Sequence, residues 1–272
     1  MRLINLKPDR TWSFVLAALP FAAILAAYTL GSAIRLAENP GDKLLPSFGA
    51  MAEAVRHMAL EPDPRSGIYH LWNDTASSLS LLLTALAIST LIALVFGIMI
   101  GLLPIAGAAF GPVVAVASMV PPLALLPILF IIMGLGDAAK IALIVIGTTL
   151  KLTRDMALRV HDLPREQLIK AQTLGASTWQ VGLRVVLPQM LPRLIDAVRL
   201  ELGPAWLFLI AAEAIAADSG LGYRIFLLRR YLAMDVIIPY VIWITFLAFL
   251  MDLALRLVQR RAFPWFAGAR TA

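Results

Sequence analysis

The sequence predicts an all-α integral membrane protein with about six transmembrane helices. Of its 272 residues, 60% are hydrophobic, and the mean hydropathy of +0.84 lies far above that of a soluble domain. The apolar residues are gathered into long runs. A helix needs about 20 such residues to cross a hydrocarbon layer about 30 Å thick. We therefore expect a chain that crosses the membrane several times.

The predicted spans cover approximately residues 13–34, 77–103, 109–133, 138–158, 194–217 and 237–258. Basic residues precede the first span, as they do in a signal peptide, at Arg2, Lys7 and Arg10. Its apolar run is longer than a typical signal h-region, so we interpret it as an uncleaved helix.

Basic residues predict the orientation of the chain. Most of the 23 Lys and Arg residues lie on one side if the N-terminus is inside, because residues 159–193 and the C-terminal end then face the same compartment. This topology accounts for the net charge of +6 without a nucleic-acid partner. We expect a cytoplasmic N-terminus at 1–12, one transmembrane domain at 13–265 and a cytoplasmic tail at 266–272.

The external segment at 35–76 contains one predicted amphipathic helix, from Pro46 to Leu60. Its apolar residues fall on one helical face, at Phe48, Met51, Val55 and Met58. Two interpretations stay open: a helix that lies on the membrane surface, and a ledge on which an external partner docks.

The second and third spans contain residues that affect helix packing. Gly97 and Gly101 form a G-x-x-x-G pair, which permits a close helix approach. Four prolines interrupt the third span, at Pro112, Pro121, Pro122 and Pro127. Each removes a backbone hydrogen bond, which hydrocarbon tolerates only beside protein or a cavity. The span is either a kinked packing helix or a broken helix in which the last three prolines line a translocation path.

The hydrophilic segment at 159–193 is predicted to form a compact structure outside the bilayer. Asp162 and Pro164 indicate a helix start, and Gly175 suits the left-handed position that ends a helix. The apolar residues between them share one helical stripe, at Leu168, Ala171 and Leu174.

A second short helix is predicted to follow in the same segment. Ser177 and Gln180 form an S-x-x-Q capping box at its start. Its apolar residues are Trp179, Val181, Val185 and Val186. Pro188 and Pro192 are expected to end it and to turn the chain back toward the membrane. Such a protruding pair of helices suits a soluble partner.

Ionisable residues lie inside the fifth span, at Arg199, Glu201 and Glu213. A charge at the bilayer centre costs roughly 2.5–3.5 kcal/mol on insertion scales, so these residues should face protein or water. For Arg199 and Glu201 the alternatives are a structural ion pair and a place on the path. Glu213 is a candidate for the path or its gate.

The external loop at 218–236 carries three arginines, Arg224, Arg229 and Arg230. They form either a solvated face or a surface that attracts an anion or an acidic partner.

The sequence offers no chemistry for catalysis. It contains no G-x-x-x-x-G-K-[ST] phosphate loop, no H-E-x-x-H motif and no cysteine. Its histidines, His57, His70 and His161, are scattered over loops on both sides. We expect no catalytic residue, no metal site and no cofactor in this chain.

The segment at 159–193 resembles the cytoplasmic loop of binding-protein-dependent ABC importer permeases. The signature of that loop is E-A-A, three residues, Gly, nine residues and I-x-L-P. Gly175 is followed by nine residues and then by Val185, Val186, Leu187 and Pro188, so the second half fits in register. The first half departs, because the E-A-A positions hold Ile169, Lys170 and Ala171.

The resemblance covers roughly residues 70–265. It points to the branch that imports nitrate, taurine and aliphatic sulfonates through four runs: Pro121-Pro122-Leu-Ala-Leu-Leu-Pro127 with Gly134-Leu-Gly136, Ala212-Glu213, Gly220-Leu-Gly222, and Arg260-Arg261-x-x-Pro264-Trp265. The resemblance implies a type I importer fold in a bacterial inner membrane. It also implies a second permease, either another copy of this chain or a related one, an external (periplasmic) substrate-binding protein, and a cytoplasmic ABC ATPase dimer that holds ATP and Mg²⁺.

The resemblance implies that the loop between spans 4 and 5 is a coupling helix. The residues that it assigns to ATPase coupling are Ala171, Leu174, Gly175, Ala176, Trp179, Leu187 and Pro188. The alternative function is a secondary transporter or channel that is not coupled to ATP. That class predicts internal repeats and ion-binding carboxylates in several spans, whereas Glu201 and Glu213 lie in one span.

Overall fold

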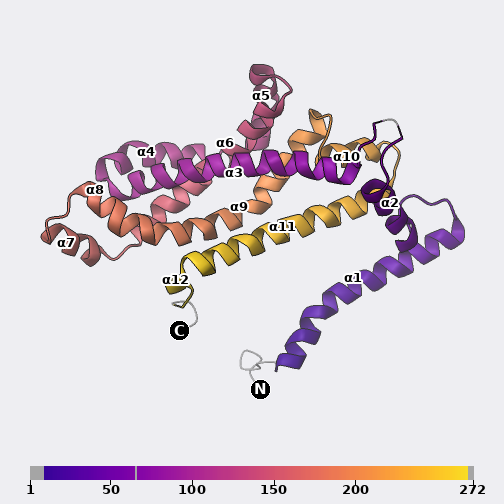
Figure 1. Cartoon of the computed structure of the whole chain (residues 1–272), viewed down its shortest axis with the longest axis horizontal. Coiled ribbons are helices and arrows are strands. Elements are labelled where there is room, and N and C mark those ends of the chain that lie inside the picture. The colour runs from indigo at the N-terminus through magenta and orange to yellow at the C-terminus, as the bar shows by residue number, and fades with distance from the viewer. Residues whose placement is uncertain (1–8, 65, 269–272) are drawn as a thin grey trace. The chain divides into compact units, whose positions relative to one another are not determined.

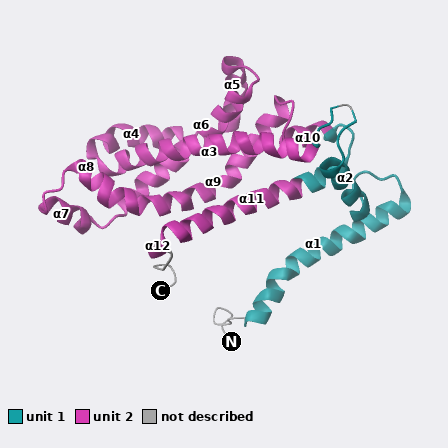
Figure 2. Ribbon diagram, in the orientation of Figure 1, with its two compact units in different colours: residues 1–69, 228–240 teal, residues 70–227, 241–272 magenta. Residues whose placement is uncertain are grey.

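The computed structural model describes residues 9–64 and 66–268, and every regular element among them is helical (Figure 1). The chain divides into two compact units. One contains residues 1–69 with 228–240, and the other contains residues 70–227 with 241–272 (Figure 2).

The first unit holds helices α1 (Arg10–Glu38) and α2 (Phe48–Leu60). The Asp9 carboxylate caps α1 by accepting from the Trp12 amide, and Ser47 caps α2. The predicted amphipathic helix is therefore confirmed, beginning two residues later than expected. The Ser32 hydroxyl donates to the Leu45 carbonyl at 2.9 Å and ties the connection back to α1.

Three helices form the core of the second unit: α3 (His70–Leu102), α6 (Asp137–His161) and α9 (Leu187–Ile215). The G-x-x-x-G pair lies where α3 meets α6. A Cβ atom on Gly97 would stand 2.5 Å from Cβ of Met156, and one on Gly101 would stand 2.6 Å from Cβ of Val160. The predicted close approach is confirmed, because no larger side chain fits at either glycine.

The third predicted span is a broken helix. The structure divides it into α4 (Pro104–Ala117), the short 3₁₀ helix η2 (Pro122–Leu125) and α5 (Leu126–Met133). The two halves meet at 81°, because Pro121 and Pro122 cannot donate the backbone bonds that would continue α4. Pro112 stays inside α4, and Pro127 lies in the first turn of α5.

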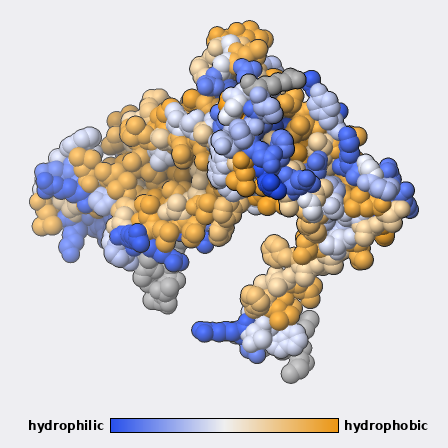
Figure 3. Space-filling model, turned by 45° about the vertical axis from the view of Figure 1, so that its right-hand side comes forward, coloured by the Kyte–Doolittle hydropathy of each residue, from blue (hydrophilic) through white to orange (hydrophobic). Residues whose placement is uncertain are grey.

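The remaining helices of the chain are α7 (Arg165–Thr173), α8 (Thr178–Val181), the π-helical turn η3 (Gly182–Val186), α10 (Leu221–Arg229), α11 (Met234–Ala262) and α12 (Pro264–Gly268). By length and apolar composition, α1, α3, α11 and the bent α4–α5 pair are candidate membrane spans within the described residues. The predicted fourth and fifth spans, α6 and α9, are 25 and 29 residues long but carry several charged residues. Figure 3 shows hydrophobic residues over much of the visible surface and hydrophilic residues gathered in separate patches.

Candidate functional site

The segment between α6 and α9 forms an elbow, defined here as residues 165–181. Gly175 stands at its corner with a φ of +83° and ends α7. The amide of Ala176 donates to the carbonyl of Ala171 at 3.0 Å, and that of Gly175 donates to Gln172 at 2.9 Å. This pair of bonds is the Schellman motif, which needs a left-handed residue at the glycine position.

The second arm of the elbow starts as predicted. The Gln180 amide donates to the Ser177 hydroxyl, and the Gln180 side chain accepts from the Ser177 amide at 2.8 Å. Both halves of the capping box are therefore formed.

Two expectations about this segment are wrong. Asp162 caps no helix start; it ends α6, and Pro164 precedes α7 without a side-chain cap. Pro188 and Pro192 do not end the second helix, because α9 begins at Leu187 and contains both. The π-helical turn just before Pro188 explains this, since the Leu187 amide reaches back five residues to Gly182 and widens the turn ahead of the proline ring.

One face of the elbow packs against the core of the second unit. Leu168, Ala171 and Ala176 are partly buried against a cluster that includes Val181 and Met190. Of the predicted coupling residues, Ala171 and Ala176 thus contact the chain's own core, and Leu187 is half-buried.

Other apolar side chains of the elbow are exposed. Leu174 is 82% exposed and Trp179 is 74% exposed, on either side of the Gly175 corner. Ile169, at the position where the family signature has glutamate, is also exposed. Pro188 is exposed at the start of α9.

One hydrogen bond fixes the elbow to α9, and a second joins α9 to α6. The Gln189 side chain donates to the Gln167 side chain at 3.1 Å, which joins α9 to α7. The Arg193 guanidinium donates to the Arg159 carbonyl at 3.0 Å, which joins α9 to α6. A force on the elbow would therefore reach both long helices.

Arg199 has structural partners. Its Nε lies 2.6 Å from Asp252 on α11, and its Nη1 lies 3.1 Å from Asp196, one turn earlier. Glu201 does not have the expected hydrogen-bonded cation, because its Oε2 is buried without a hydrogen-bond partner. Lys151 is near enough to attract its charge.

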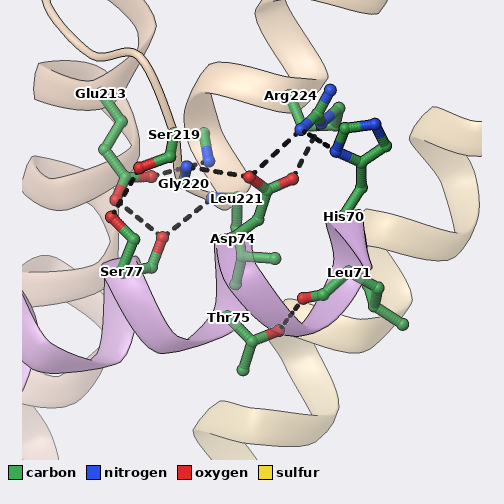
Figure 4. Close-up of polar contacts among 12 residues, drawn as sticks. His70, Leu71, Asp74, Thr75, Ser77, Glu213, Ser219, Gly220, Leu221 and Arg224 are labelled. Atoms are coloured by element: carbon green, nitrogen blue, oxygen red, sulfur yellow. Dashed lines mark hydrogen bonds and ion pairs between the residues drawn. The ribbon is translucent and has the colours of Figure 1, made fainter. Parts of the chain in front are cut away.

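Glu213 lies in a second polar cluster, at the external end of the predicted topology (Figure 4). Its side chain is fully buried. It accepts from the Ser78 hydroxyl at 2.7 Å and from the Gly222 amide at 2.8 Å. A Cβ on Gly220 would stand 2.5 Å from Cδ of Glu213, which explains the glycine there. The Ala212-Glu213 and Gly220-Leu-Gly222 runs thus form one packed contact.

Arg224 belongs to the same cluster and is not part of a solvated face. Its Nε donates to the fully buried Asp74 carboxylate at 2.8 Å, and its Nη2 lies 3.0 Å from Nδ1 of His70 (Figure 4). Arg229 and Arg230 are exposed. The sequence interpretation missed Asp74 and Ser78, although a carboxylate and a serine one turn apart at the start of an apolar helix indicate a buried polar contact.

Two cavities adjoin the broken helix. A cavity of about 290 Å³ at the break is lined by Ser118, Pro122, Gly147 and Lys151. A larger one of about 850 Å³ lies between α4, α6 and α7, with Arg154 and Arg165 on its wall. The sequence interpretation also missed Lys151 and Arg154, both inside the predicted fourth span. Within the described residues, no cluster of three or more metal-ligating side chains occurs.

Comparison with known proteins finds relatives that are transport permeases. The taurine transport system permease protein TauC of Escherichia coli K12 is 37% identical over 195 residues, which cover 72% of this chain and 71% of TauC. The putative aliphatic sulfonates transport permease protein SsuC of the same strain is 34% identical over 146 residues, 54% of this chain and 56% of SsuC.

A solved structure of the MetNI methionine ABC transporter, in an inward-facing conformation, shares the fold. One of its chains matches with a TM-score of 0.57 at 20% identity, over 69% of this chain and 95% of that chain. The fold is thus that of a type I importer permease. Residues 89–264 match the family described as binding-protein-dependent transport system inner membrane component. The chain belongs to that family of membrane-embedded ABC importer permeases.

Proposed function

We propose that the elbow of this permease seats in a cytoplasmic ABC ATPase and transmits its movement to a path for a small sulfonate-like anion. The family works with an ATPase and a substrate-binding protein, and this chain has no phosphate loop of its own. ATP and Mg²⁺ would accordingly be held by the ATPase dimer.

The exposed apolar pair Leu174 and Trp179 is the observation that carries the coupling role. Burial of one such side chain contributes roughly 1.5–3 kcal/mol. Trp is also enriched among the residues that dominate the binding energy of protein interfaces. Gly175 and the capping box fix the backbone between them, so each side chain is held in place for burial by a partner.

The solute class is supported by the relatives. TauC is named for taurine and SsuC for aliphatic sulfonates, and both kinds of compound carry a sulfonate group. An external binding protein would deliver such an anion to the path, in which Pro121, Pro122 and Pro127 place a bend. In this proposal two copies of the chain form the path, with both termini in the cytoplasm.

Co-purification tests the coupling role. The chain should retain its ATPase subunit through affinity purification in mild detergent, whereas Trp179→Ala and Leu174→Ala should each lower the retained ATPase at equal permease level. Trp72→Ala is a matched control, because Trp72 is a half-exposed tryptophan in the first turn of α3 and is not part of the elbow. Wild-type permease that never retains an ATPase would favour a transporter not coupled to ATP.

The absence of cysteine makes the orientation testable. Ser177→Cys on the elbow and Ser66→Cys in the external segment each introduce a single thiol. A membrane-impermeant maleimide added to intact cells should label the Cys at position 66 and leave the Cys at position 177 unlabelled until the cells are opened. The reverse pattern would contradict the proposed topology.

A further inference from the structure

The two cavities beside the broken helix share one electrostatic property. Lys151 lines the smaller cavity, and Arg154, His161 and Arg165 line the larger one. Among the described residues that line either cavity, none carries a carboxylate. Both cavities therefore suit a negative group and disfavour a cation.

The basic side chains of α6 that line the two cavities form a row along one helical face. Lys151, Arg154 and His161 are spaced by three and then seven residues, so they share that face. At 1.5 Å per residue, Arg154 lies about 4.5 Å beyond Lys151 along the helix, and His161 lies about 10 Å farther. The row leads from the break between α4 and η2 toward the elbow.

Lys151 and Arg154 differ from the neighbouring cations in the same bundle. Lys140 pairs with Asp137 at 2.8 Å, Arg159 pairs with Asp155 at 2.6 Å, and each partner is on the same helix. Within the described residues, no carboxylate lies within ion-pair distance of Lys151 or Arg154. Lys151 instead lies 5.8 Å from the centre of the Phe208 ring.

A charged lysine that is bonded to no carboxylate has a high free-energy cost inside a membrane span. Lys151 lies inside the predicted fourth span, where an ionisable residue normally pairs or faces a water-filled cavity with a function. Its three N–H donors can bind sulfonate oxygens, and the charge-assisted bonds that result are stronger than neutral ones.

We propose that Lys151 binds the anionic group of the transported solute at the helix break, and that Arg154 receives it on the way to the cytoplasmic side. This inference rests on the proposed function and names the residues of its path. The solute leaves Lys151 because Arg154 lies a single helical turn away, as in other paths with several weak sites.

A structural role for Lys151 gives a different expectation. Glu201 is near enough for Coulombic attraction, although no ion pair joins the two residues. If Lys151 only neutralised Glu201, removal of the Glu201 carboxylate would restore transport to a variant that lacks the Lys151 charge. The double variant Lys151→Gln/Glu201→Gln would then transport normally, whereas our proposal predicts that it stays defective.

The test is uptake of radiolabelled taurine, ethanesulfonate and nitrate by vesicles that hold the permease, its ATPase and its binding protein. Lys151→Gln should lower the uptake of the transported anion by roughly 10-fold to 100-fold, the effect of losing one charged hydrogen bond. Lys151→Arg should retain most uptake. Arg159→Gln is the matched control, since it removes one positive charge from α6 outside both cavities, and its uptake should stay normal.

The outcomes separate this inference from the proposed function. Normal uptake by Lys151→Gln, or restored uptake by the double variant, would overturn the role of Lys151 and leave the solute class intact. A wild-type complex that takes up none of the three anions but takes up a neutral or cationic solute would overturn both. Equal ATPase retention in all variants establishes that they assemble.

Discussion

Replacement of Gly175 by valine tests the elbow directly. Gly175 has a φ of +83°, and a Cβ built on it meets no atom within 4 Å. The substitution therefore adds backbone strain without a steric clash in the chain. A left-handed conformation costs an L-residue roughly 1–2 kcal/mol, and a β-branched residue lies at the upper end or beyond.

The elbow has little stability of its own with which to absorb this cost. The first arm, α7, has nine residues, and isolated helices of fewer than about 12 residues are marginal in water. A cost of 1–2 kcal/mol lowers the ratio of formed to unformed elbow by roughly 5-fold to 30-fold. We expect substrate-stimulated ATP hydrolysis by the reconstituted complex to decrease, by at most that factor, while the permease still inserts into the membrane.

A graded series and a matched glycine sharpen this test. Gly175→Asn should cost least, since asparagine tolerates the left-handed region, and Gly175→Ala should fall between Asn and Val. Gly67 in the external segment has a φ of +69° and equally open space, so Gly67→Val imposes the same strain at a site outside the elbow. Normal stimulated hydrolysis in Gly175→Val, with Gly67→Val also normal, would refute the role of the corner.

Three further predictions concern stability and transport. Gly97→Leu should lower the stability of the detergent-purified protein by roughly 1–3 kcal/mol or more, because the leucine side chain would overlap backbone and side-chain atoms of α6. The control Gly111→Ala, in open space on α4, should leave the stability unchanged. Glu213→Ala should destabilise the protein by about 1–3 kcal/mol for each buried donor left unpaired, and a thermal midpoint equal to wild type would contradict this. Arg224→Gln should reduce stability without changing which anion is taken up, since Arg224 binds Asp74 inside the protein; altered anion selectivity would instead support an electrostatic role on the surface.

Much of the elbow could be predicted because its determinants are local. The left-handed corner at Gly175 and the capping box of Ser177 and Gln180 depend on residues within one turn of each other. Helix ends set by prolines were less predictable. Pro188 lies inside a continuous helix because a π-helical turn precedes it, and nothing in the local pattern indicates that turn.

The polar clusters could not be predicted from the sequence, because their partners are distant in the chain. Ser78 and Glu213 are 135 residues apart, and Asp74 and Arg224 are 150 residues apart. A buried carboxylate in an apolar run implies a partner but does not identify it. For the same reason Arg199 was recognised as a residue that needs a partner, while Asp252 on α11 was not identified.

Uptake in reconstituted vesicles tests the central claim most directly. Vesicles with the permease, its ATPase and its binding protein should accumulate a sulfonate against its gradient only when ATP is present on the ATPase side, and Gly175→Val should abolish most of that accumulation. Vesicles that contain this polypeptide alone should not accumulate the solute. Uphill uptake by the polypeptide alone, or ATP-driven uptake that is indifferent to the elbow, would contradict the account.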